Sequence, residues 1–216
     1  SATYTGSELS ALVSGAGNAL WANRAALVAA GTFSAFFADI GIGGSFWFYS
    51  GGRWRPSAGR VILKNLTSSV THNTTTRTVM DYATIPAGLW QDGDIIDLEW
   101  CKTLTGTDTD TTETALSAVA ATFGDAMNLT TAALTSANPI VNARWRWRRL
   151  GATSVRPISI SGSVGLGTAG AIPSDPTITT NLDTTDAYLQ LSGKLTTGAG
   201  AVTALRAFTV TLIAGA

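Results

Sequence analysis

The chain has 216 residues, of which 13% are charged, and its 14 lysines and arginines balance its 14 aspartates and glutamates. A net charge of zero excludes the basic surface field expected of a dedicated nucleic-acid binder. The chain has one cysteine and no apolar run of about 18 residues, which excludes an intrachain disulfide, a cysteine-based metal site and insertion of a helix into a membrane.

A helical pattern marks the beginning of the chain. Residues 7–30, SELSALVSGAGNALWANRAALVAA, repeat apolar side chains at helical spacing. Gly15 and Gly17 divide this pattern into two short predicted helices, and Gly31 provides a stop. Helices this short are marginal alone, so we expect residues 1–40 to form an anchoring or stem segment that packs against other parts or copies of the chain. The apolar residues expected at this subunit interface are Leu9, Leu12, Leu20, Trp21 and Leu27.

From residue 41 onward the pattern changes to a two-residue alternation, which is typical of β-strands. Turn motifs such as SGGR, PAG, QDGD, LTGTD and TTGAG separate the alternating runs. Threonine, which suits a pleated surface, occupies 33 positions. The predicted strands are 45–50, 60–66, 76–84, 94–104, 114–121, 140–150, 154–164, 186–196 and 202–213. Because no long helical crossovers separate them, residues 41–216 are predicted to form an antiparallel β-sandwich head of jelly-roll-like type.

Two tryptophans lie in predicted turns rather than in strand interiors. They are Trp54 in GGRWRPSAG and Trp90 in PAGLWQDGD. A tryptophan in a turn either stacks on the face of a sugar or covers one end of a sandwich, and covering is the favoured reading here. Trp54 and Trp90 are nevertheless the candidate ligand-binding residues of the chain.

Two predicted strands carry opposite charges on their outer faces. The acidic residues are Asp97 and Glu99, in DIIDLEW. The basic residues, in NARWRWRRL, are Arg144, Arg146 and Arg148. Opposite charges on adjacent antiparallel strands contribute about 0.2–1 kcal/mol per pair, so we expect these two strands to be neighbours. The alternatives are that the arginines contact another subunit, or that they bind phosphate or a polyanionic glycan; membrane activity is the least favoured.

Residues that could perform catalysis are sparse. The single histidine, His72, lies in a threonine-rich stretch without a nearby acid, and Cys101 alternates with Trp100 inside a predicted strand. Neither pattern indicates nucleophilic catalysis, and we expect no enzymatic activity and no cofactor. A weaker alternative is a pair of glycosidase carboxylates. The acids available for it are Asp92, Asp94, Asp97 and Glu99.

The segment TGTDTDTTE contains oxygen ligands of the kind that calcium prefers. These weak candidates for metal ligands are Asp108, Asp110 and Glu113. The segment lacks the glycine and the final bidentate acid of a complete calcium-binding loop. We therefore expect a polar hairpin loop there and no bound metal.

Three segments resemble the fibre proteins of tailed bacteriophages. Residues 15–31, GAGNALWANRAALVAAG, look like a short helical segment of these proteins, with Trp21-Ala-Asn in place of a longer alanine-rich spacer. The matching positions are Gly17, Ala19, Leu20, Arg24, Ala25, Ala26 and Leu27. Residues 82–116 resemble the IPAG turn, strand and threonine-rich loop of a β-rich virion head, and residues 187–214 resemble its final hairpin. The resemblance implies a trimeric tail-fibre or head-fibre protein with a jelly-roll head.

These observations lead us to expect a non-enzymatic virion protein, a homotrimer whose head attaches to a glycan or protein of the host surface. Repetition of weak sites would supply avidity. Residues 1–40 would bind other virion proteins. With no secretory signal visible at the N-terminus, assembly is expected in the bacterial cytoplasm. The alternatives are a capsid decoration or assembly protein without receptor binding, and a lectin-like carbohydrate-binding module.

Overall fold

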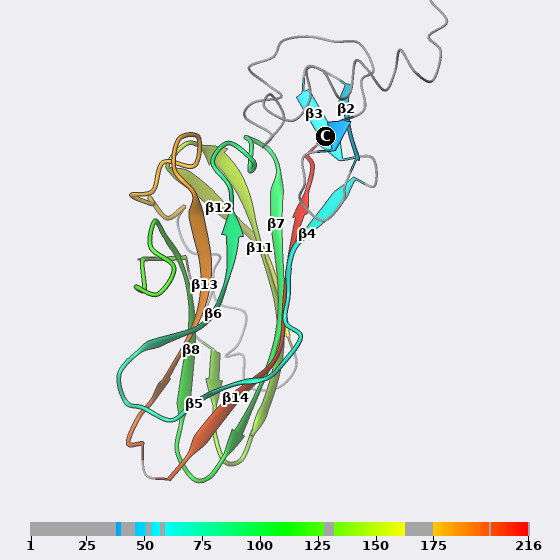
Figure 1. Ribbon diagram of the computed structural model, residues 1–216. Helices are drawn as coiled ribbons and strands as arrows, with labels where there is room; N and C mark the ends of the chain where they lie inside the picture. The colour runs from blue at the N-terminus through cyan, green and yellow to red at the C-terminus, as the bar shows by residue number, and fades with distance from the viewer. Residues whose placement is uncertain are drawn as a thin grey trace, which may run out of the picture. The chain divides into compact units, whose positions relative to one another are not determined.

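The computed structural model describes residues 38–39, 46–50, 53–56, 59–127, 132–162, 175–198 and 200–215. The chain divides into two compact units, Ser1–Val61 and Ile62–Ala216. Every regular element in the described ranges is a β-strand, as Figure 1 shows. The helices predicted within residues 7–30 lie outside the described residues.

The first unit contains a three-stranded antiparallel sheet in the order β1-β2-β3. Its strands are β1 (Ala38–Asp39), β2 (Phe46–Ser50) and β3 (Arg53–Pro56). The second of these strands matches the one predicted at 45–50. Trp54 lies within β3, opposite Tyr49, so its predicted position in a turn is wrong.

The second unit contains two antiparallel sheets, which confirms the all-β class predicted for this part of the chain. The five-stranded sheet has the order β10-β8-β13-β6, with β9 paired to β8. Its strands are β6 (Thr78–Ile85), β8 (Asp110–Ser117), β9 (Asp125–Ala126), β10 (Ala132–Leu134) and β13 (Ala187–Leu195).

The six-stranded sheet has the order β12-β11-β7-β14-β4, with β5 paired to β14. Its strands are β4 (Arg60–Asn65), β5 (Val70–His72), β7 (Ile95–Thr105), β11 (Ile140–Gly151), β12 (Ser154–Gly162) and β14 (Val202–Ile213).

Eight of the nine predicted strands match observed ones with ends shifted by at most two residues. Their two-residue alternation predicts them well because it reflects burial of one face of each strand.

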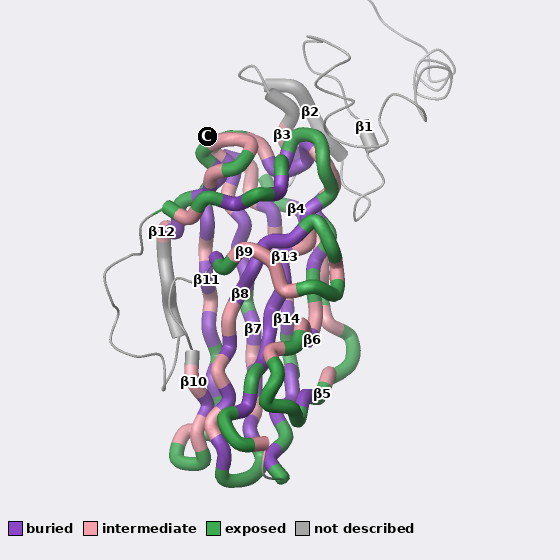
Figure 2. Tube along the Cα trace, turned by 90° about the vertical axis from the view of Figure 1, so that its left-hand side faces the viewer, coloured by how far each residue is buried: buried purple, intermediate pink, exposed green. Residues whose placement is uncertain are grey.

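The core of the second unit lies between the buried faces of these two sheets, and Figure 2 shows buried and exposed residues alternating along their strands. In β11, Val141, Ala143, Trp145 and Trp147 are buried, as the sequence predicts. The Trp145 ring meets the Trp100 ring edge-on, with 5.3 Å between their centroids, and also meets Trp147 edge-on. Such aromatic pairs add about 0.5–1.5 kcal/mol each beyond the burial of their area.

One strand was predicted with the wrong bounds. The sequence predicts a strand at 114–121 and a polar hairpin loop before it, but β8 runs from Asp110 to Ser117. Asp110, Thr112 and Thr114 are all buried on its inner face. Because this inner face is polar, the strand shows no alternation of apolar and polar residues by which it could be recognised.

Candidate functional site

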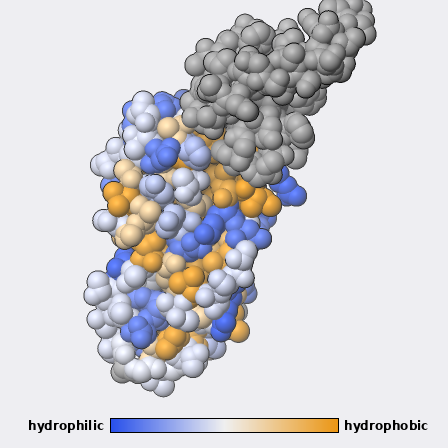
Figure 3. Space-filling view, viewed as in Figure 1, coloured by the Kyte–Doolittle hydropathy of each residue, from blue (hydrophilic) through white to orange (hydrophobic). Residues whose placement is uncertain are grey.

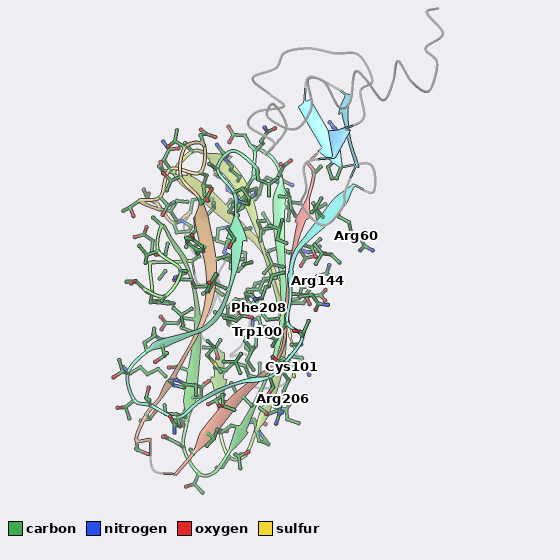
Figure 4. The ribbon with its side chains drawn as sticks, viewed as in Figure 1. Arg60, Trp100, Cys101, Arg144, Arg206 and Phe208 are labelled. Carbon is green, nitrogen blue, oxygen red and sulfur yellow. The ribbon has the colours of Figure 1, made fainter. Side chains whose placement is uncertain are left out.

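A charged face formed by β7 and β11 brings together the acidic and basic residues singled out from the sequence. The two strands pair antiparallel, with Glu99 opposite Arg144 and Asp97 opposite Arg146. Because side chains alternate along a strand, these residues share the outer side of the six-stranded sheet. Figure 4 shows Arg144 on this outer side, whereas Trp100 and Phe208 lie between the sheets. The two strands predicted to be neighbours from their charges are therefore adjacent.

Asp97 is the centre of this charged face. Its carboxylate accepts hydrogen bonds from Arg144 Nε at 2.8 and 3.0 Å and from Arg146 Nε at 3.1 Å. Glu99 forms a further ion pair with Arg144 at 3.1 Å. The Asp97 side chain is 5% exposed and that of Arg144 is 42% exposed, so the arginines cover the carboxylate. Burial alone would raise the pKa of Asp97, but the arginine hydrogen bonds and charges outweigh burial and leave this pKa below its ordinary value.

This electrostatic arrangement decides what the charged face can do. The Asp97 carboxylate stays ionised at neutral pH, so it has no proton to donate as a general acid. The guanidinium groups of Arg144 and Arg146 remain partly exposed, and such groups can contact anionic oxygens. Arg148 is exposed on the same strand, and Arg206 of β14 donates from Nε to Thr103 Oγ1 at 3.2 Å.

Cys101 lies on the same side of β7, two positions beyond Glu99. Its side chain is half-buried and forms no disulfide. Burial raises the pKa of the thiol, and the charge of Arg206 offsets this only in part. Because the thiolate is the reactive form, Cys101 is a poor nucleophile in this setting.

Trp90 is buried, so its prediction as a candidate ligand-binding residue is wrong. Its side chain is fully enclosed, and its Nε1 donates to the Asp94 carbonyl oxygen at 3.0 Å. The Asp94 carboxylate in turn accepts hydrogen bonds from the backbone N–H groups of Gln91 at 3.1 Å and Gly215 at 2.9 Å. The alternative reading, in which this tryptophan packs onto the sandwich, is the one that the structure shows.

Arg149 ties the Trp90 turn to a second loop, a role that the sequence analysis missed. Its guanidinium donates to the carbonyl oxygen of Trp90 and pairs with the carboxylates of Asp92 and Asp183. The Arg149 side chain is 4% exposed, while both acids are more than half exposed. The burial of Arg149 could have been predicted from the sequence, because Arg149 lies two positions after the buried Trp147 and therefore on the same side of β11.

The three acids considered as weak metal candidates serve separate structural roles. Asp108 accepts hydrogen bonds from three backbone N–H groups, those of Thr109, Thr197 and Gly198. Glu113 pairs with Arg77 at 2.8 Å. Asp110 lies an odd number of positions from Glu113 on β8, so the two carboxylates point to opposite faces. Within the described residues, no group of three or more His, Cys, Asp or Glu side chains is placed to hold a metal ion.

A polar cluster lies inside the second unit, between β7 and β8. Lys102 forms an ion pair with Asp110, and neither side chain is exposed to solvent. The Lys102 ammonium also donates to Thr112 Oγ1 at 2.8 Å. Burial lowers the pKa of Lys102, and the charge of Asp110 offsets this in part. Lys102 was not among the residues predicted for a site, although extending the alternation of Leu98 and Trp100 by one step places it on the inner face.

His72 of β5 borders this cluster. It is buried, and its Nε2 has no hydrogen-bond partner among the described residues. Burial lowers the pKa of His72. The positive charges of Lys102 and Arg77 lower this pKa further, whereas the negative charge of Asp110 raises it. The acid missing from the sequence around His72 is supplied in the fold by Asp110, which lies on another strand.

The other predicted site residues fall outside what the structure describes. These are the Trp54 side chain and Leu9, Leu12, Leu20, Trp21 and Leu27. No family model, curated protein or solved structure matches the chain. Among the residues that are described, no helix has the length and apolar character needed to cross a membrane.

Proposed function

We propose that this chain is a non-enzymatic structural protein of a bacteriophage particle, a homotrimeric fibre whose β-rich head attaches to a glycan or protein on the host surface. In this proposal, residues 1–40 bind other virion proteins. The sequence resemblance of residues 15–31, 82–116 and 187–214 to phage fibre proteins supports it. The jelly-roll-like form of the head is supported by consecutive strands that change sheets, as β6, β7 and β8 do.

The observation that carries the proposal is that buried charged side chains of the second unit bind other groups of the same unit. Asp97 holds two arginines, Asp94 holds backbone N–H groups, and Arg149 bridges two loops. Asp94 and Asp97, two of the four acids considered for a glycosidase, are buried. These groups fix strands and turns, which favours a rigid scaffold over a catalytic centre.

The outer face of the six-stranded sheet is the contact between copies in this proposal. It carries the partly or fully exposed Arg144, Arg146 and Arg148, and the exposed apolar side chains of Ile140 and Leu150. Arginine is enriched at protein interfaces, and interfaces between identical subunits are more apolar than the rest of the protein surface. Figure 3 shows apolar and hydrophilic residues interspersed over the surface of the second unit.

Light scattering of the full-length chain at micromolar concentration tests the trimer. The wild-type chain is expected at three times its monomer mass. Ile140→Asp combined with Arg148→Glu is expected to give monomers, because both changes place charge in the contact. The control Val119→Asp changes an exposed residue in the loop after β8 and leaves the trimer intact. A wild-type monomer refutes the proposed assembly.

Adsorption of the labelled full-length chain to a panel of bacterial strains tests attachment. Saturable binding to one or more strains, competed by an excess of unlabelled chain, supports the attachment role. An intact trimer that adsorbs to no strain refutes attachment and leaves the decoration or assembly protein as the better proposal. Binding to isolated glycans by a monomeric chain favours the lectin-like module instead.

A further inference from the structure

The Lys102–Asp110 pair joins the two sheets in a place where charges are costly. Both side chains are completely buried, one on β7 and the other on β8. Each ion loses its hydration there, and mutual attraction repays that loss only when the surrounding hydrogen bonds are complete. A reaction that removed both charges without separating the two groups would relieve this penalty.

The pair and two neighbouring groups are arranged for such a reaction. Lys102 Nζ contacts Asp110 Oδ2. The Thr112 hydroxyl lies 2.8 Å from Nζ and 3.4 Å from that same carboxylate oxygen, so it touches both partners. The other carboxylate oxygen, Oδ1, accepts a hydrogen bond from the backbone N–H of Lys194 at 3.1 Å. A nucleophile, an acyl carbon, a proton relay and a donor to the carbonyl oxygen are therefore present together.

We propose that Lys102 and Asp110 form an intramolecular amide bond between Nζ and Cγ, which covalently links β7 to β8 across the sandwich. A proton first passes from the ammonium to Oδ2, which gives a neutral amine and a neutral carboxylic acid. The amine lone pair then attacks Cγ. As the C–N bond forms, the C–Oδ2 bond breaks, and Oδ2 leaves as water with its own proton and one from Nζ. No electrons are exchanged with an oxidant or reductant.

The surrounding residues assist each part of this step. Burial favours the neutral amine of Lys102 and lowers the pKa of Lys102 accordingly. The Thr112 hydroxyl carries the proton from Nζ to the departing oxygen. The Lys194 N–H stabilises the negative charge that develops on Oδ1, as donors to oxyanions do in acyl transfer. In the product, the amide N–H keeps Thr112 Oγ1 as its acceptor, and the carbonyl keeps the Lys194 N–H as its donor.

Gly193 and His72 complete the setting. A Cβ atom at Gly193 would lie 3.1 Å from Asp110 Oδ1 and 3.1 Å from His72 Cδ2, so a larger residue there would crowd the carboxylate and the imidazole. The imidazole therefore lies close enough to the carboxylate for the charge of Asp110 to act on the His72 pKa. The charged and titratable groups that face the pair are His72 and, on the five-stranded side, Arg77. This inference goes beyond the proposed virion role and does not depend on it.

Mass spectrometry of the denatured full-length chain tests the proposal. The wild-type mass is expected to be lower than the sequence mass by one water molecule. Trypsin is expected to leave residues 78–144 as one peptide, because an amidated Lys102 carries no charge for the protease to recognise. A wild-type chain that folds, has the full sequence mass and is cut after Lys102 overturns the proposal.

Three variants sharpen the test. Lys102→Met is expected to show its full sequence mass, while the control Lys64→Met, which removes a half-exposed ion pair with Asp81, keeps the deficit of one water. Thr112→Val is expected to delay the loss of water after synthesis, because the proton relay is missing. A Thr112→Val chain that links as fast as wild type removes the relay from the proposal. If Lys102→Met does not fold, the wild-type peptide map still decides the outcome.

Discussion

Replacing Asp97 by asparagine should destabilise the second unit measurably. The substitution keeps the shape of the side chain and removes the charge that holds Arg144 and Arg146 against β7. A hydrogen bond to a charged group contributes about 1.5–3 kcal/mol. Breaking a fully buried ion pair costs about 3–5 kcal/mol, and breaking an exposed pair costs about 0–1 kcal/mol. Because Asp97 is buried while its partners are 42% and 34% exposed, we expect a loss of about 1.5–2.5 kcal/mol of unfolding free energy.

Urea denaturation followed by tryptophan fluorescence measures this loss, and a double-mutant cycle with Arg144→Gln isolates the pair. A coupling energy of about 1 kcal/mol is expected for groups in direct contact. Glu99→Gln is the matched control. Glu99 also pairs with Arg144, but its side chain is 57% exposed, so its loss should cost less than about 0.5 kcal/mol.

The pH dependence of stability independently checks that the charged form of Asp97 is the one that stabilises the fold. The pKa of Asp97 is lower in the folded chain than its ordinary value of 3.8. Its stabilising contribution is therefore complete above this ordinary value and is lost as pH falls through the folded pKa. The difference between wild type and Asp97→Asn should stay constant from about pH 5 to 8 and shrink below about pH 4. A variant within about 0.5 kcal/mol of wild type at pH 7, or an energy difference that does not begin to shrink as pH falls below 3.8, refutes the reasoning.

Three further predictions follow from buried groups. Trp90→Ala should cost about 3–5 kcal/mol in urea denaturation, because it leaves a cavity and removes one of the two hydrogen bonds that the Asp94 carbonyl oxygen accepts; a loss below about 1 kcal/mol contradicts its burial. Gln190→Leu should speed amide hydrogen exchange in residues 118–124, because the Gln190 amide nitrogen donates to the three carbonyls of Val119, Ala120 and Thr122; unchanged exchange there would rule this out. His72→Phe should flatten the pH dependence of stability. Burial lowers the pKa of His72 below its ordinary 6.5, so the wild type loses stability as pH falls through 6.5 toward the folded value, and an equal slope in the variant argues against a neutral buried imidazole.

Strand positions followed from the sequence wherever one face of a strand is apolar. In β11 the alternation of tryptophan with arginine predicts both the element and its buried side, because burial of one face selects every second residue. The pairing of β11 with β7 was also predicted, from the opposite charges of Arg144 and Asp97. Short strands such as β9, with two residues, show no pattern and were missed.

The alternation of apolar and polar residues could not predict which polar side chains are buried. The acids and threonines of β8 look like a loop because their buried partners lie on other strands, and the sequence does not show which strands those are. Lys102 reaches Asp110 across the space between two sheets, and the buried imidazole of His72 comes from a third strand.

The sequence by itself determined that residues beyond about position 41 alternate as strands, and which side of most strands is apolar, since that information is local and repeats every two residues. The tertiary structure alone decided that Trp90 is enclosed, that Arg149 bridges two loops, and that Lys102 and Asp110 meet in the interior. These contacts join strands and turns that belong to different parts of the fold. Only the packing of one sheet on the other, which buries apolar surface across the whole unit, brings them within reach.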